Sequence, residues 1–158
     1  GRFILKKRNN IKTIFFLIGK KYYFADQRNQ NIMPKEKFQI EFPIHASPSM
    51  LYQYFSTPSG LGEWFADNVN SRGEMFEFIW DGVAEEAKLL AFKSDDRAKF
   101  HWVEDEDENA YFEFKIQVDA LTKDVSLIIT DFAEEDEIEE SKMLWENQIG
   151  ELKHIIGA

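Results

Sequence analysis

Apolar and aromatic side chains recur at every second position in several short segments between residues 73 and 132. This spacing places them on one face of a β-strand, because successive side chains of a strand point to opposite faces. Turn signals separate the segments, and Asp81-Gly82 is typical of a tight hairpin. The expected strands are 73–80, 83–92, 97–103, 111–118 and 125–132. Consecutive hairpins predict an antiparallel sheet with one strongly aromatic face.

The segments on either side of this array add one more strand and three helices. Residues 35–44 alternate in the same way and predict a first strand. Ser47-Pro48 and Thr57-Pro58 each join a helix-capping residue to a proline, which predicts short helices over 48–55 and from 58 to about 65. Apolar residues then recur at helical spacing and predict one long amphipathic helix over about 135–156. They are Ile138, Trp145, Ile149, Leu152 and Ile156.

This order predicts an α+β fold. We expect a curved antiparallel sheet of about six or seven strands wrapped around the long C-terminal helix, with two short helices after the first strand. The aromatic face of the sheet needs an apolar cover, and the last helix is the long element that can supply one.

Composition limits the classes of function. Fifteen Phe and four Trp in 158 residues supply a core for one domain. The chain has no Cys, which excludes disulfides and thiolate metal sites and suggests a cytoplasmic protein.

Residues 1–32 carry eight basic side chains and one acidic one. Subtracting these from the totals of 19 and 29 leaves 11 and 28, a formal charge of −17 for residues 33–158. Such a body should repel nucleic acid and anionic membrane.

Residues 1–32 are a separate question, because their basic composition breaks off at Met33-Pro34. The apolar run 14–18 is too short for a signal peptide or a membrane span. A β-hairpin over 13–25 is one interpretation. Another is that 1–32 is an extension or an upstream translated segment, with the domain at 33–158. If this segment is ordered, it could also pair two copies of the chain as a homodimer.

The body resembles the START-like, or helix-grip (SRPBCC), superfamily, which includes the birch-pollen allergen, polyketide cyclases and the heat-shock-chaperone ATPase activator domain. The last of these is the most similar branch. The resemblance covers about 33–158 and depends on four pieces: the Trp145 helix, GEMFEFIWDG (73–82), LIITDFA (127–133) and FQIEFPIHASPSMLYQYFSTPSGLGEWFADNV (38–69). It implies a cavity between helix and sheet, with STPSGLGEWFADNV beside its mouth. The acidic turn 104–109 and the acidic helix start 134–140 are not general features of the family.

Other chemical interpretations fail on spacing. Gly60 and Gly62 lack the third glycine of a dinucleotide site, and no Lys-Ser/Thr follows them. Asp105, Asp107 and Asn109 begin like a calcium loop, but the turn glycine and the closing carboxylate are missing, so a solvated acidic turn is expected. The three histidines lack metal-ligand spacing, and His101 should face solvent, on the strand face opposite Phe100 and Trp102. We find no catalytic acid–base pair, and we expect neither an enzyme nor a cofactor nor a metal site.

The aromatic face is the remaining candidate site. It should meet the last helix and enclose an apolar pocket for a hydrophobic or lipid-like molecule. Trp64 and Phe65 would form the mouth, with Glu63 and Asp67 as rim carboxylates. The opposing interpretation is that the rings simply fill the core. The predicted lining and mouth residues are Trp64, Phe65, Phe76, Phe78, Trp80, Phe100, Trp102, Phe112, Phe114, Trp145 and Ile149.

Two other functions stay open. The first is a co-chaperone-like interaction module, in which the acidic segments 104–109 and 134–140 meet a basic protein partner. The second is a cyclase-like enzyme, for which the sequence shows no acid–base pair. Fold alone does not choose among these functions.

Overall fold

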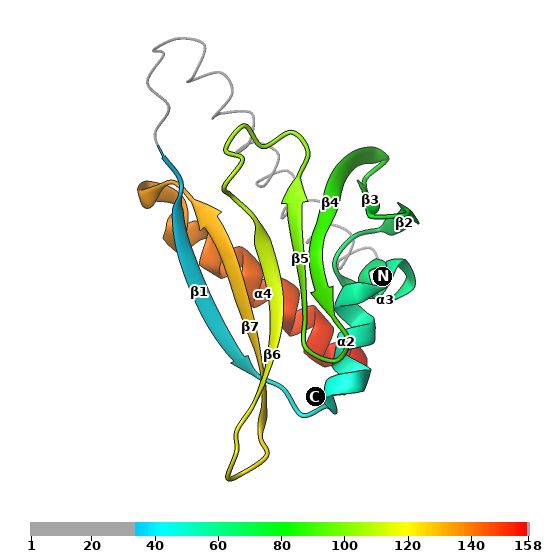
Figure 1. The fold of residues 1–158 in the computed structure, drawn as a ribbon, viewed down its shortest axis with the longest axis vertical. Coiled ribbons are helices and arrows are strands. Elements are labelled where there is room, and N and C mark those ends of the chain that lie inside the picture. Colours follow the sequence, from blue (N-terminus) through cyan, green and yellow to red (C-terminus); the bar gives the residue numbers. More distant parts are fainter. Residues whose placement is uncertain (1–33, 158) are drawn as a thin grey trace.

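The computed structural model describes residues 34–157, so the expectations for residues 1–32 lie outside it. Figure 1 shows the arrangement, an antiparallel sheet with α4 crossing behind it and two short helices at one end. The elements are β1 (Glu36–Pro43), α2 (Pro48–Ser56), α3 (Pro58–Trp64), β2 (Asn68–Arg72), β3 (Met75–Trp80), β4 (Val83–Lys93), β5 (Arg97–Trp102), β6 (Phe112–Val118), β7 (Val125–Ala133), η1 (Glu135–Glu137) and α4 (Ile138–Ile156).

The seven strands form one sheet in the order β1-β7-β6-β5-β4-β3-β2. From β2 to β7 each strand pairs with the next strand in the chain. β1 pairs with β7 and forms the other edge of the sheet. This topology confirms the predicted α+β architecture. The expected hairpin at Asp81-Gly82 also forms, with positive φ angles of 46° and 78°. Two successive residues with positive φ angles are characteristic of the tight hairpin turns that Asp-Gly favours.

One of the seven strands was not indicated by alternation in the sequence. β2 (Asn68–Arg72) follows α3 directly and pairs with β3. It has a single buried residue, Val69, because it forms an edge of the sheet. With one apolar side chain in NVNSR, the alternation that indicates a strand is absent from its sequence.

The two short helices begin as the capping residues predict. Ser47 Oγ accepts a hydrogen bond from the Met50 amide at 3.2 Å, and Thr57 Oγ1 accepts one from the Gly60 amide at 3.0 Å. At Gly60 the helices are in close contact, because a Cβ atom there would lie 2.0 Å from the Gln53 carbonyl oxygen. The glycine therefore allows α3 to pack against α2, and this packing positions the end of α3 against the sheet.

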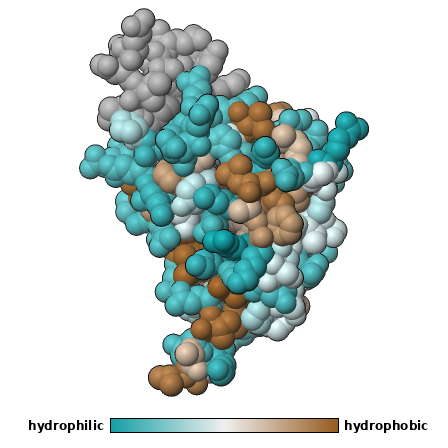
Figure 2. Space-filling view, in the orientation of Figure 1, coloured by the Kyte–Doolittle hydropathy of each residue, from teal (hydrophilic) through white to brown (hydrophobic). Residues whose placement is uncertain are grey.

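The outer face of the sheet, which is turned toward the viewer in Figure 2, is largely hydrophilic with smaller apolar groups between. The tip of the hairpin between β6 and β7 is mostly polar, but it carries one exposed apolar side chain, Leu121, which is 92% exposed. The core lies on the other face of the sheet, between the strands and α4. That layer contains most of the large aromatic side chains.

Candidate functional site

The aromatic residues predicted from strand alternation gather on the inner face of the sheet. Within this set the ring centroids of Phe100 and Phe112 lie 5.1 Å apart, and those of Trp102 and Phe112 lie 4.9 Å apart. All of them are buried except Trp102, which is partly buried. The strand residues are Phe76, Phe78, Trp80, Phe100, Trp102, Phe112 and Phe114.

Helix α4 covers this face with Trp145 and Ile149, which are 2% and 1% exposed. The Trp145 ring lies 5.8 Å from that of Phe114 and 6.4 Å from that of Phe112, measured between centroids. The structure therefore brings together the helix and strand residues that the sequence assigned to one layer. Whether they contact a ligand stays a prediction.

Trp64 and Phe65 do not form an exposed lip, and this expectation is wrong. Their exposed fractions are 0% and 2%. Trp64 Nε1 donates a hydrogen bond to the Tyr54 carbonyl at 2.8 Å, which turns the indole toward α2. Phe65 follows the last residue of α3, and its ring enters the aromatic layer, where six other rings lie within 6.1 Å of its centroid. They are Trp64, Phe78, Trp80, Phe112, Phe114 and Trp145.

The two predicted rim carboxylates have different environments. Glu63 is exposed, whereas Asp67 is partly buried. Asp67 Oδ2 accepts a hydrogen bond from the Asp81 amide at 2.7 Å, which ties the end of α3 to the β3–β4 turn. Asp67 Oδ1 is buried and has no hydrogen-bond partner among the described residues. Asp67 is therefore a turn-fixing residue with one unsatisfied acceptor.

A polar side chain that was not predicted from the sequence lies inside the layer. Gln148 on α4 is 0% exposed, and its Nε2 donates to the Phe65 carbonyl at 3.3 Å. The same carbonyl accepts a bond from Trp80 Nε1 at 2.9 Å. Gln148 Oε1 has no partner within residues 34–157. The helical spacing of Gln148 from Trp145 and Leu152 was the available signal, because it places all three on one face.

A second polar group, Asp131, links the sheet to the helix. Its Oδ2 accepts a hydrogen bond from Trp145 Nε1 at 2.8 Å, and its Oδ1 accepts one from the Phe132 amide at 2.8 Å. Desolvation raises the pKa of Asp131 to about 6, while the hydrogen bonds from Trp145 and Phe132 and the charge of Lys35 act in the opposite direction. The alternation of β7 places Asp131 on the inner face, a position that was not among the residues predicted from the sequence.

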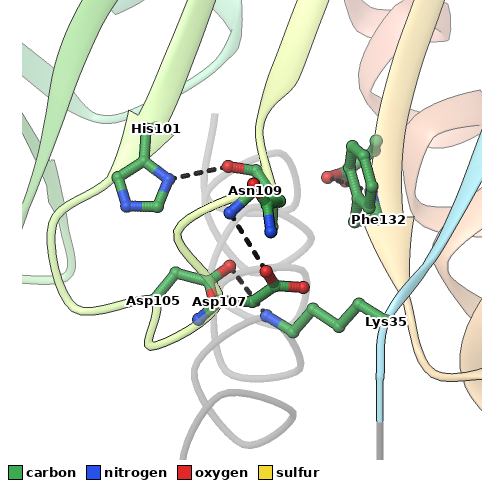
Figure 3. A network of polar contacts seen from close by, with 8 residues as sticks. Lys35, His101, Asp105, Asp107, Asn109 and Phe132 are labelled. Atoms are coloured by element: carbon green, nitrogen blue, oxygen red, sulfur yellow. Dashed lines mark hydrogen bonds and ion pairs between the residues drawn. The ribbon is translucent and has the colours of Figure 1, made fainter.

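The acidic segments lie at the same end of the molecule. Lys35 Nζ contacts Asp105 Oδ2 at 2.8 Å, and both side chains are partly buried (Figure 3). Glu36 pairs with Ala133 in the register of β1 and β7, so the segment that begins at Glu134 starts beside Lys35. Segments 104–109 and 134–140 therefore both lie at the end of the sheet where β1 begins (Figure 1).

The β5–β6 loop folds on its own side chains, as Figure 3 shows. Asp105 Oδ1 accepts a hydrogen bond from the Asp107 amide, and Asp107 Oδ1 accepts one from the Asn109 amide, each at 3.0 Å. The carboxylates thus stabilise the loop, but Asp105 is partly buried and ion-paired, not simply solvated as expected. His101 is also partly buried, with Nδ1 2.7 Å from the Ala110 carbonyl oxygen, so its predicted solvent exposure is wrong in degree.

One group of carboxylates in the described part of the chain is close enough to hold a metal ion. Oxygen atoms of Glu134, Asp136 and Glu137 lie within 4.8 Å of one another at the start of the C-terminal helix. Glu137 is 6% exposed, and the other two side chains are more accessible. Negative side chains are favoured at a helix N-terminus by the helix dipole, which accounts for their position without a metal.

None of the helices in residues 34–157 is long and apolar enough to span a membrane.

Comparison with known proteins places this arrangement in a family. A family profile described as a START-like superfamily domain matches residues 32–158. A search of curated protein sequences finds no match. A solution NMR structure of a Bacteroides fragilis protein is 37% identical and has a TM-score of 0.59; the match covers 78% of this chain and 93% of that one.

Two other solved structures share the fold at lower identity. The Aha1 dimer from Colwellia psychrerythraea is 16% identical with a TM-score of 0.62, and the match covers 75% of this chain and 93% of that one. A crystal structure of a Mesorhizobium loti protein is 15% identical with a TM-score of 0.63, over 77% of this chain and 97% of that one. The family match, together with the seven-stranded sheet and its covering C-terminal helix, shows that this chain belongs to the START-like superfamily.

Proposed function

We propose that this START-like domain binds a small, largely apolar molecule between α4 and the inner face of the sheet. The observation that supports it most is Gln148, a fully buried polar side chain with an unsatisfied acceptor inside an aromatic layer. Binding sites for small molecules combine mostly apolar walls with a few polar groups that orient the ligand. A buried acceptor without a partner costs free energy, so a residue of this kind calls for an explanation beyond packing.

The aromatic layer is compatible with such a ligand. Ring centroids within it are spaced between 4.9 Å, for Trp102 and Phe112, and 6.4 Å, for Phe112 and Trp145. These are distances at which aromatic pairs attract one another. An entering aromatic molecule would replace ring–ring contacts by contacts of the same kind. Binding then requires side chains of the layer to shift, and this rearrangement adds to the loss of translational and rotational freedom that any association costs.

Dye binding tests this proposal. The neutral fluorescent dye N-phenyl-1-naphthylamine should gain fluorescence on addition to the full chain. The variant Ile149→Trp enlarges a side chain that is 1% exposed within the layer, and it should abolish this gain. Ile155→Trp is the matched control on the same helix, where the side chain is 36% exposed, and it should bind as the wild type does.

Circular dichroism would confirm that both variants fold. Native mass spectrometry of protein purified from cells gives an independent measurement, because a retained apolar molecule would add a defined mass. Dye binding that is equal in the two variants would contradict an interior site.

A second candidate function is the binding of a basic protein partner at the acidic end. The supporting observation is that segment 104–109 contacts Lys35 through Asp105 and that segment 134–140 begins beside Lys35 in the sheet. Opposite charges across an interface accelerate association and confer salt dependence. The Colwellia neighbour is an Aha1 dimer, but at 16% identity that likeness shows only the shared fold.

An oligolysine peptide tests the second candidate. It should bind the full chain at low salt, and the triple variant Glu104→Gln, Glu106→Gln, Glu108→Gln should weaken binding. Glu74→Gln, Asp124→Asn and Glu146→Gln remove three exposed charges elsewhere and form the control. Equal weakening in both triple variants would indicate attraction by net charge alone, without a specific acidic site.

A further inference from the structure

The Phe65 carbonyl determines the orientation of the Gln148 amide. This carbonyl oxygen accepts hydrogen bonds from Trp80 Nε1 at 2.9 Å and from Gln148 Nε2 at 3.3 Å. If the amide were flipped, Gln148 Oε1 would face the carbonyl oxygen, and two acceptors would be in contact without a proton between them. The amide nitrogen must therefore face Phe65, and Oε1 must point to another part of the interior.

No hydrogen-bond donor of the described residues faces Gln148 Oε1. Gln148 is 0% exposed, and Oε1 has no hydrogen-bond partner in residues 34–157. A second acceptor, Asp67 Oδ1, is in the same condition two residues after Phe65. Buried acceptors are nearly always satisfied in folded proteins, because an unsatisfied one retains the full cost of its desolvation. Both missing partners are donors.

The buried part of the described structure also lacks a positive charge. Its buried polar and charged residues are Thr130, Glu137, Ser141 and Gln148, and none of these is basic. An anionic group placed among them would lose its hydration without gaining a cation, and it would be repelled by the unsatisfied acceptor Gln148 Oε1. A fatty acid or phosphate ester with its head group in this layer is therefore disfavoured, whereas a hydroxyl or amine finds an acceptor.

We propose that Gln148 Oε1 accepts a hydrogen bond from a hydroxyl or amine of the bound molecule, so that the ligand is an uncharged aromatic compound with a donor group and not a carboxylate or phosphate. This inference rests on the proposed function and names the class of ligand for the same site. The Phe65 carbonyl positions the amide for this contact, and the rings of the layer supply the apolar surface.

Three probes that share one ring system provide the test. Naphthalene has no polar group, 2-naphthol adds a neutral donor, and 2-naphthoate carries a negative charge at neutral pH. Quenching of the buried tryptophans reports binding of each probe to the full chain. The wild type should bind 2-naphthol about tenfold more tightly than naphthalene, since one satisfied buried acceptor accounts for that ratio, and it should bind 2-naphthoate most weakly.

The variant Gln148→Met removes the acceptor at nearly constant volume, while the Phe65 carbonyl keeps its bond from Trp80. It should bind naphthalene as the wild type does and lose the preference for 2-naphthol. Gln117→Met is the matched control, because Gln117 is exposed on the outer side of β6, and it should retain the preference. If Gln148→Met does not fold, NMR of the wild type replaces it: 2-naphthol, but not naphthalene, should shift the Gln148 side-chain amide resonances.

Each outcome separates this inference from the proposed function. If none of the three probes binds, the proposed function fails and this inference fails with it. If naphthalene binds and 2-naphthol is not preferred, the site exists but the role of Gln148 is wrong. A water molecule that satisfies Oε1 permanently would give this second result. Preferred binding of 2-naphthoate would also overturn the inference.

Discussion

Trp145 of α4 donates its indole hydrogen to Asp131 of β7, with 2.8 Å between Nε1 and Oδ2. This bond joins the helix to the strand that lies beside the edge strand β1. The acceptor is a carboxylate whose pKa is raised to about 6 by desolvation. The contact between helix and sheet is thus polar and titratable at one point, although the surrounding layer is aromatic.

The first prediction concerns the pH dependence of stability. Because the folded-state pKa of Asp131 is raised from 3.8 to about 6, the folded protein binds the proton more tightly than the unfolded chain does. The contribution of Asp131 to stability is therefore fully present below about pH 4 and is lost as the pH rises to about 6. Relative to Asp131→Asn, the wild type should lose about 1–3 kcal/mol of unfolding free energy over this range.

Urea denaturation of both proteins at a series of pH values measures this difference. Asp131→Asn is the reference, because it keeps the side-chain shape and does not titrate. The other charged groups that act on Asp131, Lys35 and Asp105, are present in both proteins. A difference between the two proteins that stays constant from about pH 4 to about pH 6 would show that the carboxyl is not desolvated.

The second prediction concerns the indole donor. Trp145→Phe keeps an aromatic ring in the layer but removes the bond to Asp131 Oδ2. The charged carboxylate then loses a stabilising partner, so the pKa of Asp131 should rise further. We expect a loss of about 1–3 kcal/mol at neutral pH and a smaller loss when Asp131 is protonated. Carboxyl NMR titration of Asp131 gives the pKa directly, and an unchanged or lower value would refute the role assigned to this bond.

The third prediction compares two glycines of α3. A methyl group at Gly60 would lie 2.0 Å from the Gln53 carbonyl oxygen, which belongs to the backbone of α2 and cannot move freely. Gly60→Ala should therefore destabilise the fold by about 2 kcal/mol or more. At Gly62 the nearest atom is the Val69 nitrogen at 3.9 Å. Gly62→Ala should be neutral or stabilising by up to about 1 kcal/mol, because alanine favours helix. Thermal unfolding of both variants measures the difference in stability between them. This difference would vanish if α2 and α3 were not in close contact.

The fourth prediction compares two glycines of α4. Gly150 is exposed within the helix, and an added Cβ atom would meet nothing within 4 Å. Gly150→Ala should stabilise the protein by about 0.5–1 kcal/mol. Gly157 ends the helix with a φ of 72°, where its amide bonds to the Lys153 carbonyl. Gly157→Ala should cost about 1 kcal/mol, because an L-residue is strained in this conformation. Denaturant unfolding should show that the two substitutions change the free energy of unfolding in opposite directions. Changes in the same direction would contradict the assigned end of α4.

The sequence by itself determined the elements other than β2 and the faces that they bury. Period-two alternation placed Phe76, Phe100 and Phe112 on one side of a sheet, and helical spacing placed Trp145 and Ile149 opposite them. Capping residues fixed the starts of α2 and α3. These features are local, so a short window of sequence contains them. β2 was missed because an edge strand with one buried residue leaves no such pattern.

The tertiary structure alone decided which groups meet across the layer. The burial of Phe65, the contact of Gln148 with the Phe65 carbonyl and the bond from Trp145 to Asp131 each join residues from different elements. The sequence separation in the second pair is 83 residues. Periodicity states which face a side chain occupies, but a hydrogen bond depends on the relative placement of two packed elements. For that physical reason the polar groups that carry the functional proposals became visible only in the folded protein.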